Sequence, residues 1–162
     1  MTARLVVSDT SPIRVLWHIS QLALLGEFFE DVLIPPAVAR ELESPPSQIA
    51  PIPLAAVPKC RVQAPKDVAA TKELEAELQT AEAEAIVLAR ELGAELLIDE
   101  RAGRLVAKRL GIGYLGVIGL LLRAKQAGII AEVLPLVLRA RDEMNFFVSD
   151  AVIEQVRELA GE

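Results

Sequence analysis

Two short apolar runs in this chain each end in an aspartate, and a segment with helical spacing follows each of them. The runs are "RLVVSD" at 4–9 and "ELLID" at 95–99. Two further runs have the length of strands, "VLI" at 32–34 and the weaker "IGYLG" at 112–116. Strands that alternate with helices predict a parallel sheet with helices on both faces. The expected fold class is therefore α/β, a three-layer α/β/α arrangement around a central parallel sheet of about four or five strands.

The expected helices have readable ends. Ser11 followed by Pro12 resembles an N-cap with proline at the first helical position, and Pro35 and Pro36 open "PAVARELE" in the same way. A longer helical pattern runs over 80–92 and ends at Gly93. Further helices are expected at 100–110, 117–127, 131–143 and 149–160, the last with Ser149 as its cap.

Six of the ten prolines fall in the stretch 44–66. Prolines at this density cannot occupy a helix interior, so we expect a long surface loop that contains one short edge strand at 60–63. An interdomain linker is the alternative, but the 43 residues before it lack enough core to fold alone. A chain of 162 residues has the usual size of one domain. We therefore expect a single domain over 1–162, with this proline-rich loop as an excursion.

Composition excludes several classes of protein. The net charge of −6 has the wrong sign for a protein that coats nucleic acid through bulk electrostatics, although it is compatible with a nuclease that has an acidic metal site. Cys60 is the only cysteine, which rules out an internal disulfide and fits a reducing, cytoplasmic location. No apolar stretch approaches the roughly 20 residues of a membrane span, and the first residues do not resemble a secretory signal.

Acidic residues from separate segments are expected to meet at one edge of the sheet. Side chains at the carboxyl ends of parallel strands project into the crevice where α/β sheets bind ligands, which places Asp9 and Asp99 together. Glu41 follows the strand at 32–34, and the helix at 80–92 carries Glu82 and Glu84. Glu82 and Glu84 are two residues apart, which is a rotation of about 200° around a helix, so their side chains cannot both point into one pocket. Periodicity alone does not decide between them.

Carboxylates that converge repel one another, so such a cluster is stable only when it is protonated or bound to cations. Oxygen ligands without histidine or cysteine favour Mg²⁺ or Mn²⁺. A hydrated divalent ion can activate water and neutralise charge at a phosphodiester, so hydrolysis of a nucleic-acid backbone is the expected chemistry. Taken singly, Asp9 and Asp99 could be helix caps and Glu41 and Glu84 could be solvated; the joint arrangement favours a metal site.

Five segments, taken in order, resemble the PIN-domain family. They are "VVSDTSPI", "VLIPPAVAREL", "AEAEAIVLARELGAELLIDERAGRLVAKRLG", "GVIGLLLRAKQAGII" and "FFVSDAVIEQVRELAGE". The resemblance covers nearly the whole chain apart from the proline-rich loop. It implies an α/β/α fold around a parallel sheet and a ribonuclease that depends on Mg²⁺ or Mn²⁺, often the toxin of a toxin–antitoxin pair.

The resemblance also implies the site residues. Glu84 is preferred to Glu82 on this ground alone, with Glu82 as the second choice. Thr10 or Ser11 would contact a water on the metal, and Arg14 departs from the usual family pattern. The four family acids match, in chain order, Asp9, Glu41, Glu84 and Asp99.

The leading expectation is thus a Mg/Mn-dependent endoribonuclease of the cytoplasm, and the alternative is a non-catalytic PIN-fold module that binds RNA or protein. A phosphate-transfer signalling domain fits less well, because a paired acid after the first strand is missing. Arg101, Arg104 and Lys108 recur at i, i+3 and i+7, either as a solvated face or as a track for RNA phosphates that includes Arg14.

Partners other than RNA are also expected. Hydrophobic helical surfaces around 120–122 and 134–138 suggest a homodimer, and the same surfaces could bind an antitoxin. The pairs Phe28-Phe29 and Phe146-Phe147 are expected in the core or at a subunit interface, and the less favoured alternative is that they are base-stacking platforms.

Overall fold

A five-stranded parallel sheet forms the centre of the computed structural model, which describes residues 4–46 and 48–162. The strand order is β3-β2-β1-β4-β5. The sheet confirms the expected fold class, and its edge strand β3 lies in the proline-rich loop, where one short strand was predicted. The strands are β1 (Leu5–Ser8), β2 (Asp31–Ile34), β3 (Cys60–Val62), β4 (Glu95–Leu97) and β5 (Tyr114–Leu115).

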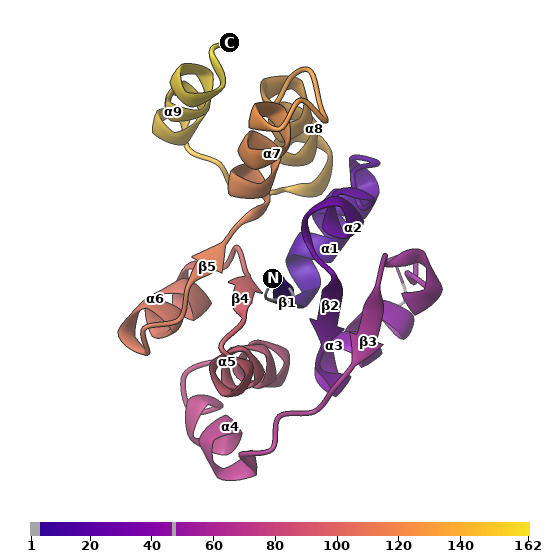
Figure 1. The fold of residues 1–162 in the computed structure, drawn as a ribbon, viewed down its shortest axis with the longest axis vertical. Coiled ribbons are helices and arrows are strands. Elements are labelled where there is room, and N and C mark those ends of the chain that lie inside the picture. The colour runs from indigo at the N-terminus through magenta and orange to yellow at the C-terminus, as the bar shows by residue number, and fades with distance from the viewer. Residues whose placement is uncertain (1–3, 47) are drawn as a thin grey trace.

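Helices cover both faces of the sheet, which completes the three-layer α/β/α fold (Figure 1). One face carries α1 (Thr10–His18), α2 (Leu24–Phe28), α7 (Val117–Gln126), α8 (Leu134–Met144) and α9 (Asp150–Ala160). The other face carries α4 (Val68–Leu74), α5 (Thr80–Leu92) and α6 (Arg101–Arg109). The remaining helix, α3 (Pro36–Glu43), packs against both α1 and α5.

Consecutive strand residues alternate between two buried cores. Val6 and Leu97 face the core under α1 and α7, whereas Val7 and Leu96 face the core under α5. This alternation follows from the two-residue repeat of an extended chain, and a strand covered on both faces must be apolar at every position. The same alternation predicts toward which face of the sheet the side chain of the next residue after a strand points.

Several predicted helix ends are confirmed. Helix α5 ends at Gly93, whose φ of 60° is the left-handed conformation that glycine adopts without strain. Ser149 accepts a hydrogen bond from the backbone of Val152 at the start of α9. The predicted start of α1 is wrong: the helix begins at Thr10, so Ser11 lies inside its first turn and is not the cap. The short helices α2 and α4 were not predicted.

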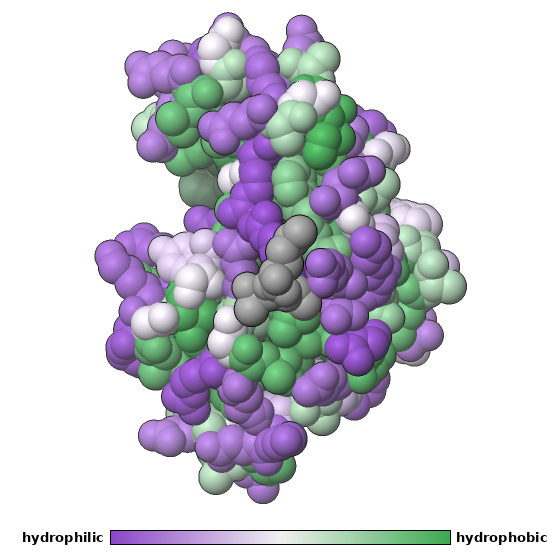
Figure 2. Space-filling model, in the orientation of Figure 1, coloured by the Kyte–Doolittle hydropathy of each residue, from purple (hydrophilic) through white to green (hydrophobic). Residues whose placement is uncertain are grey.

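The helical surfaces expected to mediate a homodimer lie mostly inside the molecule. Leu120, Leu121 and Val137 are buried in the core that α7, α8 and α9 share. On the face shown in Figure 2, hydrophobic residues appear in separate groups among hydrophilic ones. Among the helices of the described ranges, none combines the length and the apolar character that crossing a membrane requires.

The phenylalanine pairs behave differently from one another. Phe29 is buried, as expected, but Phe147 is 92% exposed. A core position is therefore wrong for Phe147, while a position at a subunit interface stays a prediction. Phe147 lies in the irregular segment between α8 and α9, where no helix covers it.

Candidate active site

The acids meet where the strand order reverses. β1 pairs with β2 on one side and β4 on the other, so the connections leave the sheet in opposite directions at the carboxyl ends of β1 and β4. Such a switch point opens a crevice in parallel sheets. Asp9 directly follows β1, and its backbone N–H donates to the carbonyl of Leu97 over 3.0 Å. This bond fixes Asp9 beside the end of β4.

A pocket of about 200 Å³ lies in this crevice, and we call it the acid pocket. Four carboxylates contribute to it from four separate segments: Asp9 after β1, Glu41 on α3, Glu82 on α5 and Glu100 before α6. Its full lining is Asp9, Thr10, Ser11, Arg14, Glu41, Gln79, Ala81, Glu82 and Glu100.

Asp9 is buried, with 3% of its surface exposed. Burial raises the pKa of its carboxyl group from 3.8 to about 7, because the charged form loses its hydration. The negative charges of Glu100, Glu41 and Asp99 raise this pKa further, and a hydrogen bond with the backbone of Thr10 opposes them. Asp9 is therefore partly protonated near neutral pH when no cation is bound.

Glu82 is the second buried acid, at 8% exposure. Burial raises its pKa from 4.5 to about 8, and the negative charges of Glu100, Asp9 and Glu41 raise it as well. Gly103 on α6 makes room for Ile98, because a Cβ atom there would collide with that side chain, whereas the Glu82 oxygen would lie at an ordinary contact distance of 3.5 Å.

The preference for Glu84 over Glu82 is not supported by this geometry. Glu84 points toward α3, where its Oε2 accepts the backbone N–H of Ala37 over 2.8 Å. The cap position of α3 is Pro35, which has no side-chain acceptor, so Glu84 satisfies a free donor at that helix end. The second choice, Glu82, is the residue that lines the acid pocket.

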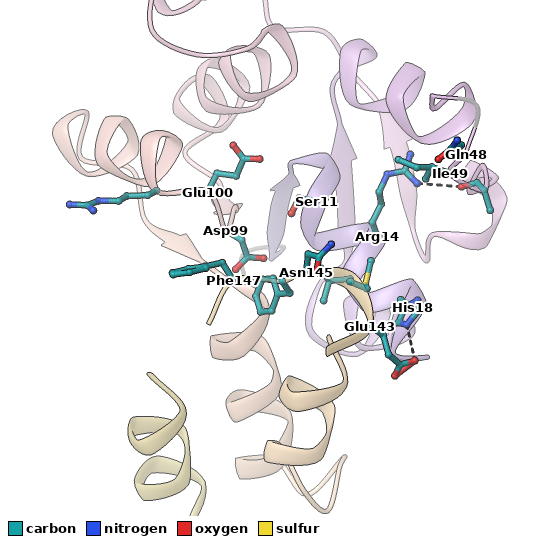
Figure 3. Close-up of a pocket in the computed structure, with 15 residues that line it drawn as sticks. Ser11, Arg14, His18, Gln48, Ile49, Asp99, Glu100, Glu143, Asn145 and Phe147 are labelled. Atoms are coloured by element: carbon teal, nitrogen blue, oxygen red, sulfur yellow. Dashed lines mark hydrogen bonds and ion pairs between the residues drawn. The ribbon is translucent and has the colours of Figure 1, made fainter. Parts of the chain in front are cut away.

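Asp99 lies next to the acid pocket but does not line it. Its Oδ1 accepts from the backbone of Val117 over 3.2 Å and from Arg104 Nη2 over 3.4 Å. Burial raises its pKa to about 6, although the Val117 and Arg104 contacts act in the opposite direction. The acid that enters the pocket is its neighbour Glu100, which was not among the predicted residues. Figure 3 shows the two side chains leaving the strand end in different directions.

Thr10 and Ser11, expected to contact metal-bound water, both line the acid pocket. The hydroxyl of Thr10 donates to Glu41 Oε2 and so orients that carboxylate. Arg14 lines the pocket too, but its guanidinium donates to the backbone carbonyls of Glu41 and Ala50. It therefore holds the C-terminal end of α3 and the proline-rich loop against α1.

The three basic residues of α6 do not form a uniform stripe. Arg104 turns inward, donating to the carbonyl of Ile98 and pairing with Asp99, with Tyr114 beside its guanidinium. Arg101 and Lys108 are exposed. Only these two of the predicted set are placed to meet a substrate from solvent.

The acid pocket suits a divalent ion by its chemistry. It offers only oxygen donors, and two of its acids are buried with pKa values raised by their surroundings. Within the described ranges, no three His, Cys, Asp or Glu side chains already surround one point as in a closed metal site. Mg²⁺ retains several waters and is usually bound by one or two carboxylates together with substrate phosphates. The residues present fit an ion of that kind.

The fold and the acid pocket fit a nucleic-acid-related, nuclease-like module. A family model described as a PIN domain matches residues 5–162, and the chain belongs to the PIN-domain family. PIN domains are generally nucleases, and they typically use divalent metal ions. A comparison with curated proteins gave no match.

Proposed function

We propose that this protein is a metal-dependent endoribonuclease and that the acid pocket is its catalytic centre. The observation that supports this is the burial of Asp9 and Glu82 in one pocket with two further acids. Burial and neighbouring acids raise the pKa values of both carboxyl groups, so their charged forms destabilise the fold unless a cation or protons compensate. Membership of the PIN-domain family points to the same chemistry.

In this proposal Asp9 and Glu82 hold Mg²⁺ or Mn²⁺, with Glu41 and Glu100 ordering the waters around it. When bound, such an ion lowers the pKa of a coordinated water and offsets the charge that develops at the phosphate. Thr10 keeps the Glu41 carboxylate in position through its hydroxyl. Asp99 stabilises the start of α7 and contributes negative charge to the pocket without lining it.

The proposed substrate is RNA, and Arg101 and Lys108 are placed to contact its phosphates because both are exposed on α6. The helix α6 begins next to Glu100, so phosphates held along it would lead into the acid pocket. A toxin role with an antitoxin partner is a further proposal that rests on the family alone. A small DNA-binding protein encoded beside this chain would support it.

The direct test is cleavage of single-stranded RNA by the purified protein with Mn²⁺ and with EDTA. We expect cleavage only with Mn²⁺, and we expect Asp9→Asn to reduce the rate at least about 100-fold, since it removes a charged ligand. The control is Glu43→Gln, an exposed acid on α3 outside the pocket. Equal rates for the wild type and Asp9→Asn would rule out this mechanism.

A second candidate is a non-catalytic module that binds RNA or protein. It is favoured by the lack, among the described residues, of three acids already arranged around one point. Calorimetric titration with Mn²⁺ separates the candidates. Saturable binding that Glu82→Gln removes supports the nuclease, whereas no binding at millimolar Mn²⁺ supports the module.

A further inference from the structure

A larger groove of about 830 Å³ adjoins the acid pocket, and we call it the side groove. The two cavities share Ser11, Arg14 and Glu100 in their linings. The opposite wall of the side groove is the segment 143–147, which runs from the end of α8 into the following loop (Figure 3). A polymer with one phosphate in the acid pocket would therefore place a neighbouring unit in the side groove.

Two of the three basic side chains that line the side groove, Arg14 and His18, are already engaged. His18 Nε2 lies 3.2 Å from a Glu143 oxygen, and Arg14 is bound to two backbone carbonyls. Asp99 and Glu100 add negative charge beside the acid pocket. A phosphate group would meet more repulsion than attraction here. An uncharged, partly polar group suits most of this lining better, while Arg101, which also lines the side groove, can contact a neighbouring phosphate.

Phe147, which lies on this wall of the side groove, has an unusually exposed side chain. At 92% it is the most exposed large hydrophobic side chain among the described residues, and the next is Leu159 at 61%. It extends from the irregular segment after α8, where Asn145 ends the helix in the left-handed conformation with φ of 56°. An exposed ring beside a polar groove is the arrangement by which proteins stack the bases of single strands.

Asp99 adds an unfilled hydrogen-bond acceptor to the same groove. Its Oδ1 carries both contacts described above, while its Oδ2 is buried and has no partner within the described part of the chain. Buried polar atoms without a partner are rare in native proteins and call for an explanation. A bound group with a donor, such as a base amino group, would satisfy Oδ2, whereas the apolar face of a second copy would not.

We infer that the side groove binds an unpaired base of a single-stranded RNA, with Phe147 as the stacking platform, next to the phosphate at the acid pocket. This inference deepens the proposed function and rests on it for the position of that phosphate. Duplex RNA is excluded as the ligand, because its bases are already stacked and their edges are turned inward. The protein would therefore select unpaired regions.

The test uses the full chain and a short single-stranded RNA that carries 2-aminopurine, a fluorescent base analogue, in EDTA so that proposed hydrolysis cannot proceed. Phe147→Ala should weaken binding about tenfold, consistent with the loss of one base–aromatic stack. Phe147→Trp should bind within about twofold of wild type because it keeps an aromatic face. Leu159→Ala, an exposed apolar residue outside the groove, is the matched control and should bind as the wild type does.

Binding should quench the 2-aminopurine emission in the wild type and in Phe147→Trp but not in Phe147→Ala. Unchanged affinity of Phe147→Ala would overturn the inference, as would equal losses in Leu159→Ala. A fall in molecular mass for Phe147→Ala in sedimentation, without any change in RNA affinity, would assign the face to self-association and would also overturn it.

These outcomes are separable from those of the proposed function. If Asp9→Asn loses cleavage while Phe147→Ala binds normally, the inference fails and the nuclease stands. If no metal supports cleavage while RNA binding still depends on Phe147, the nuclease fails and the base-binding groove stands.

Discussion

Glu82 on α5 and Glu100 before α6 line the same pocket, where burial and the negative charge of Glu100 raise the pKa of Glu82 to about 8. Neighbouring carboxylates disfavour each other's charged form because like charges repel. The two residues lie 18 positions apart in the chain and on separate elements, so the fold brings them together. Without a bound cation, the acid pocket therefore holds protons more tightly than free carboxylates do.

The stability of the metal-free protein should fall as the pH rises from about 4 to about 8. The pKa of Asp9 is about 7 in the folded state against its ordinary value of 3.8, so the folded state binds the proton more tightly. The resulting stabilisation is fully present below about pH 4 and is lost as the pH rises through 7. At pH 8, Asp9→Asn should be more stable than wild type, on the order of 2–4 kcal/mol.

Urea unfolding in EDTA at pH 5 and pH 8 checks this prediction. The difference between the two pH values should be larger in wild type than in Asp9→Asn, which retains the contributions of Glu82 and Asp99, whose pKa values are also raised. A pH dependence that Asp9→Asn leaves unchanged would contradict the assignment of the raised pKa to Asp9.

Binding of a divalent metal ion should offset the loss of stability that the repelling carboxylates of the acid pocket cause. At a concentration 100 times its dissociation constant, a ligand of the folded state adds about 2.7 kcal/mol, which corresponds to a rise in Tm of roughly 5–10 °C for a chain of this size. We expect this rise with Mn²⁺ at pH 8 in wild type and in the control Glu43→Gln. A rise of the same size in Glu82→Gln would place the ion elsewhere.

Gly116 should tolerate no side chain. A Cβ atom there would collide with the Arg104 guanidinium and lie 2.5 Å from Asp99 Oδ1, so Gly116→Ala must displace the pair that anchors α7. We expect a loss of about 1–3 kcal/mol. Gly113 is the matched control, because a Cβ atom there has no neighbour within 4 Å. Equal losses for the two alanine variants would contradict this prediction.

Glu84 should matter for stability and not for metal binding. Glu84→Ala leaves the Ala37 N–H at the start of α3 without its acceptor, which should cost about 1–2 kcal/mol. Glu84→Gln retains a side-chain carbonyl in the same place and should lose less than half of that. Denaturant unfolding in EDTA separates the two variants.

Much of the fold could be predicted from local signals. Apolar runs that end in aspartate located β1 and β4, and the glycine after the 80–92 pattern located the end of α5. The helices α2 and α4 span five and seven residues. Segments of that length complete too few turns to show an apolar stripe in the sequence, so tertiary packing determines whether they become helical.

The site was predicted less completely, because side-chain direction depends on packing. Asp9 and Glu41 line the pocket, but Glu84 contacts the start of α3 and the pocket position on α5 is taken by Glu82. The position of Glu100 could have been predicted from the alternation of side chains along β4. Leu96 and Ile98 face the core under α5, and Glu100 continues their parity, whereas Asp99 continues that of Leu97. Of the two neighbouring acids, Glu100 is therefore the one whose side chain points toward the face that α5 covers.

The exposure of Phe147 could not be predicted in the same way. Its neighbours "NFFVS" read as an apolar run, and nothing local shows that the segment leaves α8 without a covering helix. Burial of a loop residue depends on how distant elements close around it, which a single sequence does not contain.

The most direct measurement compares Glu82→Gln with Glu84→Gln, two identical changes two residues apart on α5. Isothermal titration with Mn²⁺ at pH 7.5, followed by RNA cleavage under the same conditions, reports both binding and turnover. Glu82→Gln should lose saturable binding and at least about 100-fold in rate, and Glu84→Gln should stay within about threefold of wild type. The opposite pattern, or two variants that behave alike, would contradict the assignment of the acid pocket as the catalytic centre.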